Sequence, residues 1–314
     1  MGPPMNALRR YELLDLVGEG RNGEVYKAQS EINSIVAVKI IPFYDKENAF
    51  PSDVMSKISL MEELEHKNVV RLLTVEKLED YSYGCKLIME FASSNLSRYI
   101  RENAKSGICP QQAKLFLMQI LKGLNYCHSR KVMHRNLKPA NILLTADGVI
   151  KLAAFGSSAA FDVPSLQNNH NVGTLRYRAP EMLLGLPYTN LVDIWAVGCI
   201  FVELLTLKPL FDGTSNTAVL RSIFSIFGVP TETDFKGASS YFLNTLAIEE
   251  PTIKYRRSLA RLVPILSEQG LDLLERMLCI NPCRRITAAN ALVHPYFRNF
   301  FTQTFARRIL ELNS

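Results

Sequence analysis

The sequence predicts an α+β fold of two lobes, a β-rich N-terminal lobe and a mainly α-helical C-terminal lobe. Up to about residue 91, β-branched and apolar runs alternate with glycine or polar turns, which is typical of antiparallel strands. Beyond that point, long segments show helical periodicity. Residues 90–95 (EFASSN), most of them small or polar, separate the strand-rich region from the helix-rich region and form the predicted hinge.

The N-terminal lobe is expected to span 11–91. Its strands are predicted at "YELLDLVGEG", "GEVYKAQS" and "SIVAVKII". One helix is expected at 51–65, because Val54, Ile58, Met61 and Leu64 share one helical face.

The C-terminal lobe is expected to span 96–300, with tails at 1–10 and 301–314. Its helices are predicted at "QQAKLFLMQILKGLNYCHSR", "LVDIWAVGCIFVELLT", "SNTAVLRSIFSIFG" and "GLDLLERMLCI". The sequence contains no internal repeat, and its 314 residues suffice for one large or two modest domains with a substantial core.

Composition excludes several classes of protein. The net charge of +6 is modest and the basic residues are scattered, so we expect no nucleic-acid partner. The longest apolar run, "WAVGCIFVELL", is too short to cross a bilayer, and the first residues do not resemble a secretory leader. We therefore expect no membrane association and a location in the cytoplasm, the nucleus or both.

Several motifs follow one another in a specific order. A glycine-rich turn, "GEGRNGEV", lies between two predicted strands, where glycines let backbone N–H groups approach phosphates. It is followed by "VAVK", then "HRNLKPANILL", "AFG" and "RAPE". Three glycines alone would be a weak signal, but the joint order is highly specific.

This order resembles that of the protein kinase family, over almost the whole chain. The segments "FPSDVMSKISLMEELEHKNVVRLL", "VGTLRYRAPEMLLG" and "NPCRRITAANALVHPYF" are most similar to cyclin-dependent kinases, with the cell-cycle-related branch nearest. The resemblance implies a bilobal kinase fold, ATP as the candidate ligand, and a cyclin or cyclin-like partner on the 51–65 helix.

The resemblance also assigns roles to individual positions. Lys138 would contact the transferring phosphate, Met89 would be the gatekeeper, and Asn141 would hold one metal ion. The positions implied for the nucleotide are Gly18, Gly20, Gly23, Val25, Lys39, Met89, Glu90 and Asn141.

Three acidic positions of the family hold other residues here. Asn136 occupies the position of the general base, Ala154 that of the main metal ligand, and Lys57 that of the glutamate that pairs with Lys39. A neutral amide cannot accept a proton at pH 7, and alanine has no donor atom. Asp53 could replace the lost carboxylate only if the helix slid by one turn, roughly 5 Å. The magnesium site is therefore expected to be degraded.

The activation-loop phosphorylation site is also missing. The family's threonine falls at Asn169, and the three arginines that would bind its phosphate correspond to Ser56, Arg135 and Ala159. With one arginine left and no phosphate, the family's arginine–phosphate interaction cannot form.

Residues that the family uses to support the fold are present. The resemblance implies a buried ion pair between Glu181 and Arg285, and a catalytic loop anchored by Asp193 and Trp195. His134 is interpreted as a core histidine that bonds backbone, since a base at that position is not expected.

Three functional hypotheses follow. The favoured one is a partner-binding pseudokinase of the cyclin-dependent type. The second is an active serine/threonine kinase with atypical chemistry that uses Lys39, Lys138 and Asn141. The third is a nucleotide-sensing switch that binds ATP without metal.

Overall fold

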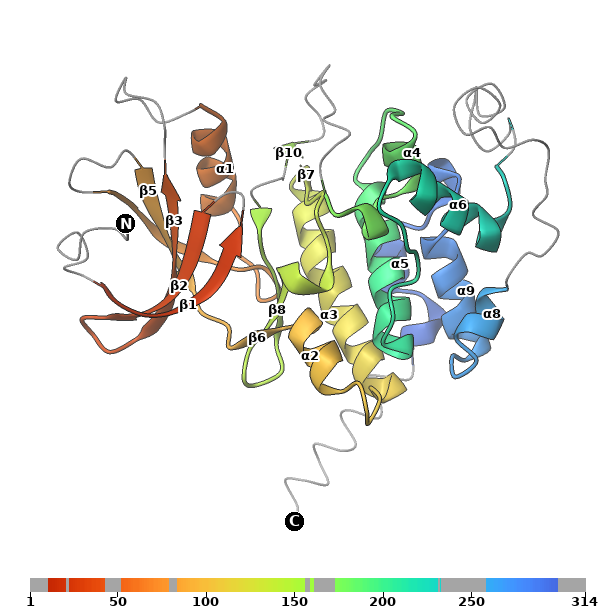
Figure 1. Ribbon diagram of the computed structural model, residues 1–314, viewed down its shortest axis with the longest axis horizontal. Coiled ribbons are helices and arrows are strands. Elements are labelled where there is room, and N and C mark those ends of the chain that lie inside the picture. Colours follow the sequence, from red (N-terminus) through yellow and green to blue (C-terminus); the bar gives the residue numbers. More distant parts are fainter. Residues whose placement is uncertain are drawn as a thin grey trace, which may run out of the picture.

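The two predicted lobes are present in the computed structural model (Figure 1). The β-sheet and helix α1 form one lobe, and helices form most of the other. This confirms the predicted α+β class. The structure describes residues 11–20, 23–42, 52–78, 84–155, 159–160, 173–230, 232 and 258–298.

A five-stranded antiparallel sheet forms the N-terminal lobe, in the order β1-β2-β3-β5-β4. The three strands expected from the sequence are β1 to β3. The sheet consists of β1 (Tyr11–Gly20), β2 (Gly23–Ser30), β3 (Ile35–Pro42), β4 (Leu72–Lys77) and β5 (Gly84–Glu90).

Helix α1 (Ser52–Glu62) packs on one face of this sheet through Ile58 and Met61. It ends three residues before the predicted limit of 65. The Leu64 N–H donates to the Met61 carbonyl, so the chain leaves the helix in a tight turn. Leu64 nevertheless remains buried in the same core, which is why its periodicity suggested a longer helix.

The C-terminal lobe is built around α3 and α5, which contact each other. Every residue of α5 from position 192 to 204 is buried, as its nearly uninterrupted apolar sequence requires. The helices are α2 (Leu96–Glu102), α3 (Pro110–Ser129), α4 (Pro180–Leu183), α5 (Leu191–Thr206), α6 (Asn216–Phe227), α8 (Leu259–Leu262), α9 (Glu268–Met277) and α10 (Ala288–Leu292).

Short strands lie between the sheet of the N-terminal lobe and these helices (Figure 1). They form a three-stranded sheet, β6-β8-β9, and a pair, β10-β7. Their bounds are β6 (Ser94–Asn95), β7 (Val132–Met133), β8 (Ile142–Leu144), β9 (Ile150–Leu152) and β10 (Ala159–Ala160). None of the helices in the described part of the chain has the length and hydropathy needed to cross a membrane.

The predicted buried ion pair is confirmed. The Arg285 guanidinium donates to both carboxylate oxygens of Glu181, at 2.6 and 3.0 Å, and both side chains are almost fully buried. Arg285 also donates to the backbone carbonyls of Leu191 and Cys279. The pair thus ties α4 to the start of α5 and to the segment after α9.

We expect Glu181→Gln to lower the free energy of unfolding by about 3 kcal/mol, because it leaves the buried Arg285 charge without a counter-ion. Urea unfolding of the purified chain measures this. The control is Glu102→Gln in the exposed pair with Arg98, which should cost less than about 1 kcal/mol. Equal losses in the two variants would contradict the assignment of Glu181–Arg285 as a structural pair.

Candidate active site

Several predicted nucleotide-binding residues form a row across the sheet. Gly18 pairs with Val25, Val25 pairs with Lys39, and Lys39 pairs with Leu87 on β5. Gly20 pairs with Gly23 where β1 turns into β2. The structure therefore brings the glycine turn and the lysine together, although they are far from each other in the sequence.

Gly23 is required at its position by close packing. Its φ of +112° lies in a region that other residues rarely adopt, and an added Cβ would lie 1.9 Å from the Ile40 carbonyl oxygen. The turn thus rests directly on β3, one residue away from Lys39.

Lys39 is half-buried and lies near Cys85 and Lys57. Burial lowers the pKa of Lys39, and the positive charge of Lys57 lowers it further. Burial also raises the pKa of the Cys85 thiol, to about 11. No carboxylate forms an ion pair with Lys39 within the described ranges, so the family's lysine–glutamate pair is replaced here by two lysines. The side chain of Asp53 lies outside the described residues.

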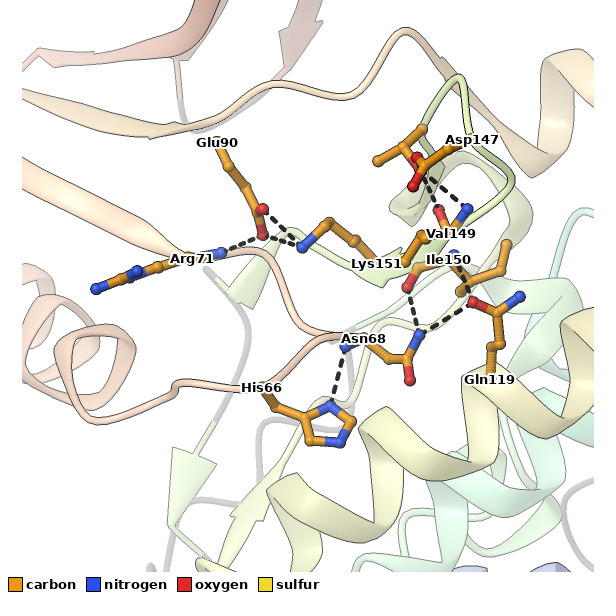
Figure 2. A network of polar contacts seen from close by, with 10 residues as sticks. His66, Asn68, Arg71, Glu90, Gln119, Asp147, Val149, Ile150 and Lys151 are labelled. Atoms are coloured by element: carbon orange, nitrogen blue, oxygen red, sulfur yellow. Dashed lines mark hydrogen bonds and ion pairs between the residues drawn. The ribbon is translucent and has the colours of Figure 1, made fainter.

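Met89 and Glu90 end β5, where the chain leaves the sheet. Met89 pairs with Ala37 on β3. The Glu90 carboxylate accepts hydrogen bonds from the Lys151 ammonium, at 2.7 Å, and from the Arg71 N–H, at 2.7 Å (Figure 2). The side chain predicted to serve a nucleotide is therefore engaged in an ion pair with the C-terminal lobe.

The residues around Asn68 form a second connection between the lobes (Figure 2). Asn68 Nδ2 donates to the Ile150 carbonyl, at 2.9 Å, and to Gln119 Oε1 on α3, at 3.2 Å. The backbones of Asn68 and Leu152 are also hydrogen-bonded, at 2.9 Å. The loop that follows α1 is thereby fixed to β9 and α3. Sequence reasoning gave no role to Asn68, Gln119 and Lys151, because their partners lie in distant segments of the chain that share no local pattern with them.

The catalytic loop is anchored by Asp193, as predicted. The carboxylate accepts hydrogen bonds from the backbone N–H groups of His134 and Arg135, at 2.9 and 2.8 Å, and its Oδ2 lies 3.0 Å from His128 Nε2. Burial alone would raise the pKa of Asp193, but these hydrogen bonds and the neighbouring histidines hold the pKa below its usual value.

Trp195 does not share this role. Its ring stacks on Phe211, with centroids 5.7 Å apart, and lies 5.2 Å from the Arg285 guanidinium carbon. The indole N–H has no hydrogen-bond partner among the described residues. The prediction that Trp195 anchors the loop backbone is therefore wrong, because the ring packs into the core of the lobe instead.

His134 is a core residue, as predicted. Its Nε2 lies 2.7 Å from the Ala153 carbonyl, and its ring packs against Phe155 with centroids 4.9 Å apart. Burial lowers the pKa of His134, so the ring is neutral at pH 7 and Nε2 donates to the carbonyl. This bond connects the catalytic loop to the turn that contains Ala154.

Asn136 does not present its amide oxygen as a base would. That oxygen is buried and has no hydrogen-bond partner among the described residues. Asn141 Nδ2 donates to the Asn136 carbonyl at 2.8 Å, so the Asn141 amide oxygen is the atom left for a cation. Lys138 is half-buried between them in the chain.

Ala154 is exposed and has a φ of +66°. The Ala153 N–H donates to the Asn141 carbonyl, at 3.0 Å, which places Ala154 beside the predicted metal residue. The left-handed region costs an alanine roughly 1–2 kcal/mol, whereas glycine, asparagine and aspartate enter it more easily. The backbone thus retains a conformation that suits an acidic side chain, but alanine supplies no ligand atom.

A divalent cation does not fit this site. Protein kinases hold magnesium with one aspartate and one asparagine side chain, and here the aspartate position is Ala154. Magnesium needs hard, usually charged oxygen ligands, and of these two positions in the described part of the chain only the neutral Asn141 oxygen is left. Asn169 of the predicted phosphorylation site lies outside the described residues, as does the side chain of Ala159.

We expect Ala154→Gly to stabilise the chain by up to about 1 kcal/mol, because glycine adopts a φ of +66° without strain. Thermal or urea unfolding measures the change. Ala146→Gly is the matched control, since Ala146 is an exposed turn residue without a positive φ, and glycine there should destabilise slightly. A loss of stability in both variants would show that position 154 is not strained.

The chain was also compared with models of known protein families. The model of the protein kinase domain matches residues 11–297, which include both lobes and all the candidate site residues. The matched region covers most of the 314 residues. This chain therefore belongs to the protein kinase family.

Proposed function

We propose that this kinase-family protein is a pseudokinase, which binds regulatory partners and transfers phosphate little or not at all. The observation that carries the proposal is the set of side chains at the three positions where the family carries carboxylates. Positions 57, 136 and 154 hold a lysine, an asparagine whose amide oxygen is buried, and an alanine. Loss of a general base alone costs about a hundredfold to ten-thousandfold in rate, and loss of the metal removes the main charge stabilisation as well.

Three carboxylates in the described part of the chain are engaged elsewhere and do not replace the missing ones. Asp193 holds the catalytic-loop backbone, Glu90 is paired with Lys151, and Glu181 is paired with Arg285. The alternative of an active serine/threonine kinase with Lys39, Lys138 and Asn141 would need a proton acceptor that none of these three residues provides.

Helix α1 supports a partner-binding role. Its inner side packs on the sheet through Ile58 and Met61, whereas Met55 is 43% exposed and Ser59 is also exposed. We propose that a cyclin or cyclin-like protein binds this outer side together with the activation segment, and that the chain acts as a decoy that sequesters it. Such a role would place the protein in the cytoplasm, the nucleus or both.

A phosphoryl-transfer assay tests the loss of activity. With ATP, magnesium and a generic protein substrate, the wild type should transfer no more phosphate than Lys39→Met. Asn136→Asp alone should remain inactive, because the metal ligand is still missing, whereas activity should rise in Asn136→Asp with Ala154→Asp and Lys57→Glu. Transfer by the wild type well above the Lys39→Met background would overturn the proposal.

Binding to a panel of purified cyclins tests the partner surface. We expect Met55→Glu to weaken binding at least about tenfold, because an interface methionine buries apolar surface worth about 1.5–3 kcal/mol. Val293→Glu is the control, since Val293 is 74% exposed in the other lobe. Failure of every cyclin to bind, or equal weakening by both variants, would contradict this surface.

A further inference from the structure

His66 lies in the loop between α1 and β4, which connects the N-terminal lobe to the C-terminal lobe (Figure 2). Its Nδ1 accepts a hydrogen bond from the Asn68 N–H, at 3.0 Å. A ring nitrogen that accepts from an N–H carries no proton, so this bond requires the neutral ring with its hydrogen on Nε2. The bond is therefore incompatible with a proton at Nδ1 of His66.

The ring of His66 also packs on helix α3. It stacks on Tyr126, with ring centroids 4.9 Å apart and an angle of 21° between the planes. The Arg130 guanidinium carbon lies 4.8 Å from the centroid of the same Tyr126 ring, so a protonated His66 would compete with Arg130 for this ring. The Tyr126 hydroxyl accepts a hydrogen bond from the Glu65 N–H, at 2.9 Å, which holds the loop on α3 beside His66.

Asn68 is packed too closely to move toward another acceptor. It is buried, and a Cβ at Gly123 on α3 would lie 2.5 Å from the Asn68 carbonyl oxygen. Its side-chain amide donates to the Ile150 carbonyl and to Gln119, and its own carbonyl accepts from the Leu152 N–H. A shift of Asn68 would disturb these contacts, and a buried N–H without an acceptor costs free energy. Loss of the bond to His66 therefore destabilises the docked loop.

The surroundings of His66 disfavour its protonated form. Burial lowers the pKa of His66 below its usual value of 6.5, and the positive charges of Lys122 on α3 and Lys151 on β9 lower it further. The neutral ring that the hydrogen bond requires is thus also the form that its environment favours.

The charged residues of the loop itself do not reverse this preference. Glu65 Oε1 lies 3.4 Å from Arg71 Nη2, so this carboxylate already has a cation beside it. Glu63 and Lys67 are exposed, and water and salt screen their charges.

We propose that His66 is an acid-sensitive connection between the two lobes. Protonation of the ring at Nδ1 breaks its bond to the Asn68 N–H, and the loop between α1 and β4 loosens from α3 and β9. The inference does not depend on whether the cleft transfers phosphate, because neither His66 nor Asn68 is assigned to catalysis or to nucleotide binding.

Acid should favour the open form of this loop. The unfolded chain, or an open loop that exposes the ring to water, binds the His66 proton more tightly than the docked loop does. The stability that the bond contributes is therefore complete above the usual pKa of 6.5 and is lost as the pH falls through that value.

Hydrogen exchange of the full chain, followed at single amides by NMR at about pH 7.5 and about pH 5.5, tests the proposal. We expect the protection factors of the Asn68 and Glu65 amides to fall at least about threefold from the higher to the lower pH. His66→Asn should abolish the fall, because an asparagine side-chain oxygen can accept the same bond from the N–H two residues on and does not titrate.

His294→Asn is the matched control. His294 Nδ1 accepts from the Tyr296 N–H in the same way, at 3.3 Å, but in another part of the C-terminal lobe. This variant should leave the response of the Asn68 amide to pH unchanged.

Three results would contradict the proposal: protection of Asn68 that does not change with pH in the wild type, an equal fall in His66→Asn, or an NMR titration in which the His66 ring has a pKa above 6.5. The first and the third need only the wild-type protein, so a folding defect in His66→Asn would not leave the proposal untested.

Discussion

The buried carboxylate of Asp193 is the constraint on which the rest of the site depends. It lies on helix α5, which is buried from position 192 to 204, and accepts hydrogen bonds from two backbone N–H groups of the catalytic loop. Arg135 has a φ of +62°, a conformation that the backbone would not keep without such bonds. Through His134, the same anchor reaches the Ala153 carbonyl and thus the turn of Ala154.

The contacts that maintain the catalytic loop are made by other residues than those that catalysis would require. The contacts that shape the loop use Asp193, His134 and backbone groups, and none of them needs a carboxylate at position 136 or 154. The chain can therefore lose its catalytic groups and keep its architecture. The strained φ of Ala154 is a direct consequence, since the surrounding bonds impose the conformation whatever side chain is present.

The sequence predicted much of the fold and little of the contact between the lobes. Strands β1 to β3 and helices α3 and α5 follow from apolar periodicity, which reports burial on one face. The order of the motifs located Lys39, Asn136 and Ala154. The ion pair between Glu90 and Lys151 could not be found in this way, because it joins residues 61 positions apart that share no local pattern.

The sequence also could not predict how burial affects the charged groups of the site. The sequence placed Lys57 opposite Lys39, but only the folded chain shows that Lys39 is half-buried and that its pKa is lowered. Because the unfolded chain holds this proton more tightly than the folded chain does, the stability contributed by Lys39 rises with pH between the folded and the unfolded pKa. Lys57 contributes to this shift, because its positive charge also disfavours the protonated form of Lys39.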